Sequence, residues 1–133
     1  MIGFHPTTQN PRRGGPGLWL PVAAYMAAIY CGAALTQVPG PAARVSDTVL
    51  HMGGYAVLAL LTLRATAAGR WSGVTLRALT LAFAITTVHG LTVEVEQMFV
   101  PSRFAEWRDV GNDAIGALAG LCAAWAWGKL FKE

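Results

Sequence analysis

Four apolar runs of about 20 residues constrain the fold of this chain more than any other feature of its sequence. They cover residues 18–37, 48–67, 74–93 and 110–131, and each is close to the ~20 residues that a helix needs to cross ~30 Å of hydrocarbon. The links between them are short, so we expect each helix to pack antiparallel to its sequence neighbours. A soluble, alanine-rich helical bundle is the alternative, but four such runs leave no polar face for water. The sequence therefore predicts an all-α fold, an integral membrane four-helix bundle.

Length and composition set the domain organisation. A chain of 133 residues forms one domain at most. Charged residues make up 13% of it, about half of the globular average, which fits a protein that lies mostly in lipid. Proline and glycine are frequent before the first run, so we predict a flexible cytoplasmic tail over residues 1–17 and the transmembrane domain over 18–133. The first run is long and no clear small-x-small cleavage site follows it, so we expect a helix and not a cleaved signal peptide.

Lysine and arginine are distributed unequally between the two sides of such a bundle. Seven of the ten lie before the first run, around the second link or at the C-terminal end, and three lie in the other two links. By the positive-inside rule, both termini face the cytoplasm. Six of the seven acidic residues lie at the opposite, outward end. The net charge of +3 therefore reflects membrane orientation, and no basic patch interleaved with aromatic residues indicates nucleic-acid binding.

Small residues inside the runs are expected to bring helices close together. The Gly116-x-x-x-Gly120 pattern of the last run and the Gly53-Gly54 pair of the second both predict a neighbouring helix at short distance. Cys31 and Cys122 fall in different runs, where buried free thiols usually act as small apolar residues. The sequence contains no CxxC motif and no Cys/His spacing of the kind that binds zinc.

The first group of polar residues opens the second apolar run. Asp47, His51 and Tyr55 are spaced four residues apart, so they share one face of a helix. Asp47 is expected to cap this helix, and an Asp–His pair one turn apart can orient the imidazole and raise its basicity. Tyr55 lies deeper, where its hydroxyl needs a partner. These three residues are site candidates, and a capped helix end held by hydrogen bonds is the structural alternative.

The second group lies between and at the start of the last two runs. Glu94 and Gln97 share a helix face, Arg103 lies in the link, and Asp109 and Asp113 are one turn apart at the start of the last helix. Asp109 is expected to cap that helix. Two carboxylates at that spacing repel each other unless a cation lies near them. Arg103 is the expected partner, since a guanidinium can bind a carboxylate through two hydrogen bonds.

Both groups lie at similar depth, at the outward ends of their helices. Unpartnered polar groups cost several kcal/mol each in lipid, so we expect the two groups to turn toward each other. The prediction is one pocket, open to the outside between the second, third and fourth helices and lined by His51, Glu94, Arg103 and Asp113. The first helix is expected to contribute mostly packing. Internal salt bridges are favoured here over a substrate-binding site and over a divalent cation bound by Asp109, Asp113, Glu94 and His51. No metal and no cofactor are expected.

The two groups together resemble the VanZ-like family of small bacterial membrane proteins. The resemblance covers residues 46–120. Its first block is Ser46-Asp47-Thr48-Val49-Leu50-His51-Met52-Gly53-Gly54-Tyr55, similar to the family's S-D-K-x-x-H-x-x-x-Y. Its second block, at the family's spacing, consists of Gly90, Glu94, Gln97, Phe99, Arg103, Asp109, Gly116 and Gly120. The order of the two blocks makes the match specific.

Four positions depart from the family's pattern. Thr48 replaces the usual lysine, Val93 replaces an acid, His89 replaces a frequent tyrosine and Asp113 replaces a common asparagine. The missing lysine puts any lysine-dependent role in doubt. The resemblance implies a multi-pass protein of the bacterial inner (cytoplasmic) membrane. Founding members are associated with low-level resistance to the glycopeptide teicoplanin, but a shared fold by itself does not define a function.

Three functions fit these residues. The favoured one is an outward-facing pocket that binds a lipid headgroup, a lipid-linked cell-envelope precursor or a glycopeptide, with Arg103 holding an anionic group. The second is a non-catalytic accessory subunit of a larger membrane complex, since alanine- and glycine-rich helix faces suit packing on partners. The third is a membrane enzyme acting on a lipid-linked substrate, with the Asp47–His51 pair as base or Glu94 as acid/base. No convincing nucleophile motif supports the third function, because Ser102 or Thr48 would have to act alone.

Overall fold

The computed structural model describes residues 15–35 and 40–130, and this part of the chain contains four α-helices and no strand. The helices are α1 (Leu20–Ala33), α2 (Asp47–Thr66), α3 (Leu76–Gln97) and α4 (Trp107–Leu130). Short 3-10 turns lie at Pro16–Leu18, Gly40–Arg44 and Trp71–Gly73. The prediction of an all-α fold is confirmed. The tail predicted over residues 1–17 falls almost wholly outside the described residues.

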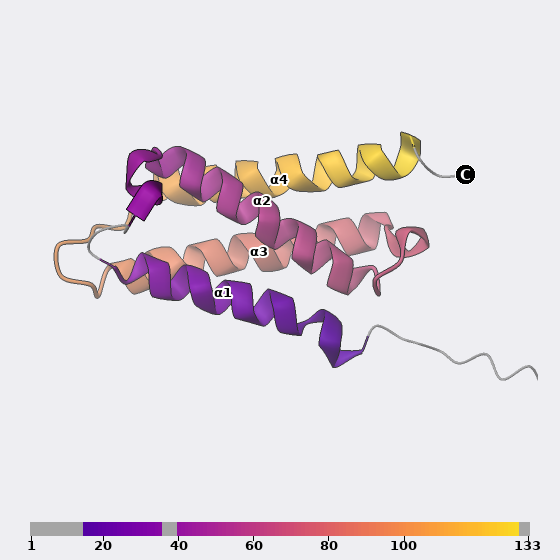
Figure 1. The fold of residues 1–133 in the computed structure, drawn as a ribbon, viewed down its shortest axis with the longest axis horizontal. Coiled ribbons are helices and arrows are strands. Elements are labelled where there is room, and N and C mark those ends of the chain that lie inside the picture. The colour runs from indigo at the N-terminus through magenta and orange to yellow at the C-terminus, as the bar shows by residue number, and fades with distance from the viewer. Residues whose placement is uncertain (1–14, 36–39, 131–133) are drawn as a thin grey trace, which may run out of the picture.

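The four helices form an antiparallel bundle, as the short links predicted. In Figure 1 each helix runs opposite to its sequence neighbour, and α1 begins at the end of the bundle where α4 finishes. α4 packs most extensively on α2, α3 contacts both of them, and α1 makes fewer contacts, with α2 and α3. The bundle is therefore a tight group of three helices with a more loosely attached fourth.

Three of the helices are long and apolar enough to cross a membrane. They are α1 with its preceding turn (Pro16–Ala33), α2 and α3. At 1.5 Å per residue, α2 and α3 extend about 30 Å or slightly more. α4 has 24 residues but is less apolar, since Asp109, Asn112 and Asp113 lie in its first two turns. Large apolar side chains such as Leu76 and Val88 are exposed on the outside of the bundle, which gives it the kind of exterior that lipid covers.

The starts of α2 and α4 differ slightly from the predicted ones. Ser46 Oγ accepts a hydrogen bond of 3.4 Å from the Val49 N–H, so Ser46 caps α2 and the prediction that Asp47 caps it is wrong. Asp47 is the first residue of the helix, where its charge still lies at the positive end of the helix dipole. α4 begins at Trp107, so Asp109, expected as its cap, lies inside its first turn.

Glycine and alanine set the distance between α2 and α4. A Cβ atom at Gly116 would lie 2.2 Å from the Met52 carbonyl oxygen, and one at Gly120 would lie 2.8 Å from the Ala56 carbonyl oxygen. The close helix contact predicted for this motif is confirmed. The buried core that continues from this contact between α2, α3 and α4 consists of Ala59, Leu63, Ala67, Ala78, Ala82, Ala117, Leu121 and Ala124.

Two other predictions about small residues are not met. A Cβ at Gly53 would have no atom within 4 Å, and one at Gly54 would meet only the Tyr25 hydroxyl, at 3.9 Å. The close helix contact predicted at this pair is wrong, because the pair lies away from α4. Cys31 and Cys122 are free thiols exposed on the outer faces of α1 and α4, and so they do not fill space between helices.

Candidate functional site

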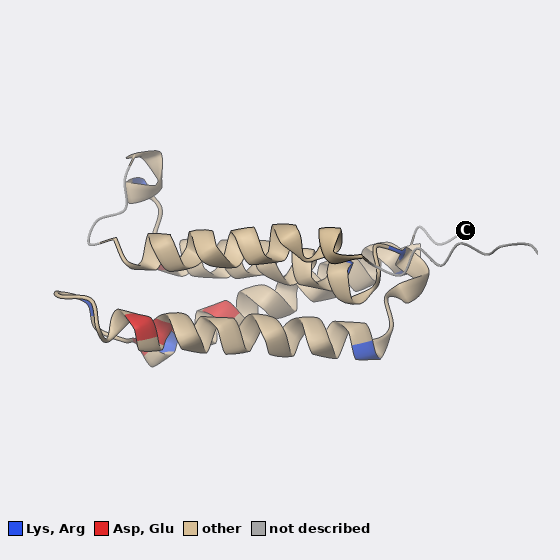
Figure 2. Cartoon of the chain, turned by 90° about the horizontal axis from the view of Figure 1, so that it is seen from below, with Lys and Arg blue, Asp and Glu red and all other residues tan. Residues whose placement is uncertain are grey.

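The predicted site residues gather at the end of the bundle where α3 finishes and where α2 and α4 begin. Figure 2 shows the acidic residues toward this end, whereas the charged residues drawn at the opposite end are lysine and arginine. The antiparallel order of the helices causes this separation, since it brings Asp47, Glu94 and Asp109 to the same end although they are distant in sequence. The predicted meeting of the two polar groups is confirmed.

His51 lies between two carboxylates of α4. Its Nδ1 is 2.7 Å from Oδ1 of Asp113, and its Nε2 is 3.6 Å from Oδ2 of Asp109. The Asp113 side chain is 1% exposed and that of His51 20%, so one edge of the ring is shielded and the other is accessible. The predicted pairing of His51 with Asp47 is wrong. Asp47 is exposed, and the imidazole turns across the bundle to α4.

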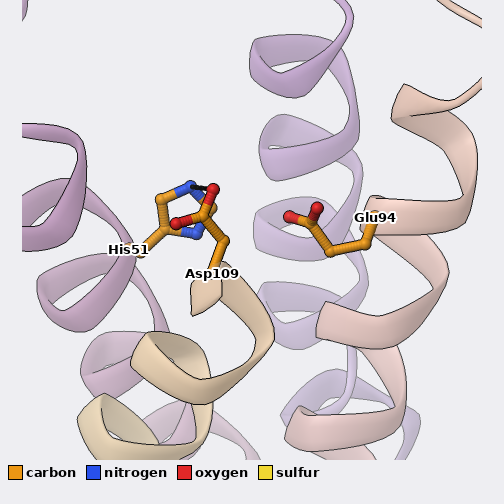
Figure 3. A group of neighbouring side chains, drawn as sticks. All are labelled: His51, Glu94 and Asp109. Atoms are coloured by element: carbon orange, nitrogen blue, oxygen red, sulfur yellow. Dashed lines mark ion pairs between the residues drawn. The ribbon is translucent and has the colours of Figure 1, made fainter. Parts of the chain in front are cut away.

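Glu94 reaches the same point from α3. It is 2% exposed, and its Oε2 accepts a hydrogen bond of 2.9 Å from the Glu106 N–H. Its other oxygen, Oε1, is buried and has no hydrogen-bond partner among the described residues. Three side chains converge here from α2, α3 and α4, those of His51, Glu94 and Asp109 (Figure 3). Each offers one ligand atom, and these three atoms lie within 4.8 Å of one another.

Gly90 makes room for the carboxylate that holds His51. A Cβ atom at Gly90 would lie 2.8 Å from Oδ2 of Asp113 and 3.2 Å from Cε1 of Tyr55. This Asp113 oxygen is also buried without a hydrogen-bond partner in the described part of the chain. Any side chain at this position of α3 would therefore displace Asp113. We call the following four residues the carboxylate–histidine cluster: His51, Glu94, Asp109 and Asp113.

Tyr55 lies one turn deeper and takes part in a separate polar contact. Its hydroxyl shares a hydrogen bond of 3.1 Å with Nδ1 of His89 on α3, which supplies the partner that its depth required. The ring of Tyr30 on α1 meets His89 edge-on, with 5.0 Å between ring centroids, and the Tyr30 hydroxyl donates to Oγ1 of Thr92. His89, Tyr30 and Thr92 were not among the predicted site residues. The sequence spacing does not indicate them as a group, since the contacts Tyr55–His89 and Tyr30–Thr92 join different helices.

Arg103 does not pair with the cluster. Its Nε and Nη2 both donate to the carbonyl oxygen of Leu35, with the Nε bond at 3.2 Å. Across residues 15–35 and 40–130, no lysine or arginine forms an ion pair with a carboxylate of the cluster. The predicted salt bridges centred on Arg103 are therefore wrong. The link after α3 turns at Ser102, whose φ is +68°, and the guanidinium lies at the end of α1 instead.

Two small cavities flank His51. The first, of about 240 Å³, lies between α1, α2 and α3, and the second, of about 200 Å³, lies between the starts of α2 and α4 and the link that precedes α4. The four polar residues that line both cavities are Asp47, His51, Gln97 and Arg103. Ser102 and Asp109 also line the second cavity. The side chains available to a ligand at this end of the bundle therefore include a guanidinium, an imidazole, an amide and carboxylates.

These cavities correct the predicted pocket in two respects. α1 lines the first cavity through Ile29, Gly32 and Ala33, so it does more than pack against the other helices. Glu94 and Asp113 are not among the described residues that line either cavity, and they are the buried members of the carboxylate–histidine cluster, beside His51. The predicted lining by His51 and Arg103 is confirmed.

The chemistry of the cluster follows from its charges and its burial. Three carboxylates surround one imidazole at a place where two of the acids are almost fully buried. A buried charge is costly unless it is paired, so such a cluster attracts a cation or hydrogen-bond donors. Comparisons of this chain with protein-family models, with curated proteins and with solved structures find no match.

Proposed function

We propose that the chain is an integral membrane protein with four membrane-spanning helices and both termini in the cytoplasm. The length and apolar character of α1, α2 and α3 support this. α4 lies against α2 through Gly116 and Gly120, and so it lies at the same depth. Its outer face exposes Leu118 and Trp125, which suit contact with lipid. The excess of lysine and arginine at the end opposite the carboxylate–histidine cluster supports an outward-facing cluster.

Membership of the VanZ-like family, and with it a place in the bacterial inner membrane, is part of this proposal. Its support is the sequence resemblance together with the position of the two blocks in space. His51 of the first block contacts Asp109 of the second, and Glu94 of the second block lies beside both.

Within this protein, the first cavity binds the polar part of an amphiphile, either a lipid headgroup, a lipid-linked envelope precursor or a glycopeptide. The observation that carries this proposal is the two-sided lining of the cavity. Ile29 and Ala33 of α1 make one side apolar, whereas Gln97 and Arg103 make the outer side polar. An amphiphile can place its chain on the first side and an anionic group on the second. About 240 Å³ is enough for a headgroup but not for a whole lipid.

Arg103 is the group that would hold the anion. A guanidinium has five N–H donors, and among residues 15–35 and 40–130 only Nε and Nη2 are engaged, both with the Leu35 carbonyl oxygen. The remaining donors can bind a phosphate or carboxylate oxygen, an interaction that Arg makes through two parallel hydrogen bonds. The contact with Leu35 also fixes the guanidinium at the rim of the cavity, so the side chain loses less freedom when a ligand binds.

Purification in mild detergent followed by lipid mass spectrometry tests this function. The wild-type chain should carry an anionic lipid or lipid-linked precursor in near-stoichiometric amount, and Arg103→Ala should lose most of it. Arg108→Ala is the matched control, because Arg108 is in the same region of the chain, is 76% exposed and lines neither cavity. If the two variants retain the same amount of lipid as the wild type, Arg103 does not hold an anionic headgroup.

An accessory subunit of a larger membrane complex is the second candidate, and the packing of α1 favours it. Val22 is the only buried residue of α1, so most of this helix is free to contact another chain. The same detergent purification separates the two candidates. A partner protein present in equal amount through successive columns supports the accessory role, whereas a chain that migrates alone with bound lipid supports the first candidate.

A further inference from the structure

Three side chains of the carboxylate–histidine cluster direct possible metal ligands to one point. His51, Glu94 and Asp109 each offer one ligand atom, and these three atoms lie within 4.8 Å of one another. The centre of a triangle with sides no longer than this is roughly 2.8 Å or less from each atom, close to a metal–ligand distance. A bound zinc ion needs distances of about 2.0–2.2 Å to nitrogen and oxygen ligands, so small side-chain rotations would complete the coordination. We propose that these three residues bind a divalent metal cation, with Zn²⁺ or Mn²⁺ as the fitting ions.

The unpartnered oxygen of Glu94 is an independent observation that points to a ligand. Glu94 is 2% exposed, and its carboxylate is directed toward His51 and Asp109 in Figure 3. Oε2 is satisfied by the Glu106 N–H, but Oε1 has no hydrogen-bond partner among the described residues. Leaving a buried acceptor unsatisfied costs roughly 1–3 kcal/mol, and more if it is charged. A cation between the three side chains would remove this cost.

Asp113 prepares His51 for metal binding. Metal-binding histidines usually donate their second ring N–H to a carboxylate, which orients the ring and raises its basicity. Asp113 can accept such a bond, since its Oδ1 lies 2.7 Å from Nδ1 of His51. The other ring nitrogen, Nε2, faces Asp109. The buried position of Asp113, secured by the absence of a side chain at Gly90, makes this orientation a fixed property of the fold.

The position of Arg103 removes the main competitor for the acids. The sequence favoured a salt bridge from Arg103 over a metal ion, but the guanidinium donates to the Leu35 carbonyl oxygen. His51 alone cannot neutralise three carboxylates even when it is protonated. A divalent cation supplies the missing positive charge, which reverses the expectation that the site holds no metal.

The ligand set and the surrounding cavity define the class of ion. One imidazole with two carboxylates suits Zn²⁺, which takes nitrogen and oxygen ligands, better than Mg²⁺ or Ca²⁺, which prefer oxygen ligands alone; the two carboxylates also suit Mn²⁺. His51 and Asp109 both line the second cavity, which gives the ion a route to the site. Three protein ligands leave at least one coordination position for water or for an anionic ligand. The metal site does not depend on which amphiphile occupies the first cavity.

Metal analysis of the full chain tests the proposal. Protein purified in detergent without an affinity tag is stripped with a chelator, incubated with Zn²⁺ or Mn²⁺ and freed of excess ion. Elemental mass spectrometry should then find one ion per chain, and thermal unfolding should shift to higher temperature with the ion present. Mg²⁺ at the same concentration should give a smaller shift. Asp113→Asn should weaken binding by about 10–100-fold, the usual effect of removing an outer partner of a ligating histidine.

Matched variants distinguish this site from other metal binding. Glu94→Gln and Asp109→Asn should lose the ion, while Glu96→Gln, two residues away on the same helix but outside the group, should keep it. His51→Gln should also lose the ion, while His89→Gln should keep it, because His89 lies outside the group. Circular dichroism of each variant shows whether the helices remain. A wild-type chain that binds no ion, or equal binding by Glu94→Gln and Glu96→Gln, would overturn the proposal, whereas the lipid result for Arg103→Ala would be unaffected.

Discussion

Replacing Gly116 by alanine is the sharpest test of how α2 and α4 fit together. The added Cβ would lie 2.2 Å from the carbonyl oxygen of Met52 and 2.6 Å from its Cα. Favourable contact between such atoms begins near 3.5 Å, so the two helices would have to separate by about 1 Å or more. Neither side can yield locally, because the atoms that meet are a helix backbone on one side and a Cβ fixed to a helix on the other.

The cost of this separation can be estimated from two effects. Overpacking a well-packed core usually costs about 1–3 kcal/mol, and an obstacle made of backbone places Gly116→Ala in the upper part of this range. The movement would also carry Asp113, three residues earlier on α4, away from His51. A hydrogen bond that is now 2.7 Å would lengthen beyond about 3.5 Å and be lost. We therefore expect a loss of about 2–3 kcal/mol of stability and a loss of the metal ion proposed for the cluster.

Gly111→Ala is the control for this experiment. Gly111 is in the same helix, but a Cβ there has no atom within 4 Å, so only the helix propensity changes. Alanine should stabilise α4 by about 0.5–1 kcal/mol at this position. Thermal unfolding of both variants in one detergent should thus give shifts of opposite sign. If Gly116→Ala is as stable as the wild type, α2 and α4 do not approach as closely as the structure indicates.

Two further predictions concern the links. The first uses variants without the two native cysteines and a thiol reagent that does not cross membranes, added from outside. It should label Ser102→Cys and spare Ser72→Cys, because both residues are exposed and lie at opposite ends of the bundle. The reverse pattern would place the carboxylate–histidine cluster in the cytoplasm. Arg103→Ala should lower stability by about 1 kcal/mol, since it removes partly exposed hydrogen bonds to the Leu35 carbonyl oxygen, while Arg108→Ala should change it by less than about 0.5 kcal/mol. A loss of more than about 3 kcal/mol at Arg103 would mean that the guanidinium pairs with the buried acids after all.

The positions of the helices could be predicted from the sequence because hydrophobic length is a local property. Each apolar run overlaps one helix, and the short links leave only an antiparallel arrangement. The starts of helices are less predictable, since they depend on single side chains. Ser46 caps α2 although Asp47 beside it is an equally suitable residue type. α4 begins before its apolar run because Trp107 and Arg108 can continue the helix into the polar region.

The site was predictable as a location but not as a set of contacts. Spacing along one helix placed Asp47, His51 and Tyr55 on a common face, but it does not say which neighbouring helix each side chain meets. His51 turns to Asp113 on α4, whereas Tyr55 turns to His89 on α3. These directions depend on how far each helix is rotated about its axis, and the close contacts at glycine fix that rotation only once the helices have packed.

Arg103 shows a second limit of sequence reasoning. Charge suggested that the nearest acids would be its partners, but its position depends on the path of the link between α3 and α4. That path includes Ser102 in a left-handed conformation, which an ordinary residue rarely adopts and which the sequence does not indicate. Its partner, the carbonyl oxygen of Leu35, is a main-chain atom that residue type cannot identify.

The loose packing of α1 has a consequence for the first cavity. In the lipid environment proposed for this chain, helices associate through close packing and hydrogen bonds. α1 fully buries only Val22, packs on α2 through partly buried side chains such as Tyr25 and Ile29, and is held further by hydrogen bonds at Tyr30 and, just beyond its end, at the Leu35 carbonyl oxygen. Regions with few buried contacts separate at the lowest free energy, so we expect α1 to separate from the bundle before α2, α3 and α4 separate from one another. The first cavity therefore has one wall on the closely packed helices, which carries His51, and one wall on α1, which we expect a molecule entering sideways from the proposed bilayer to displace. We expect its volume to change with the position of α1, while the acids, which belong to α2, α3 and α4, keep their places.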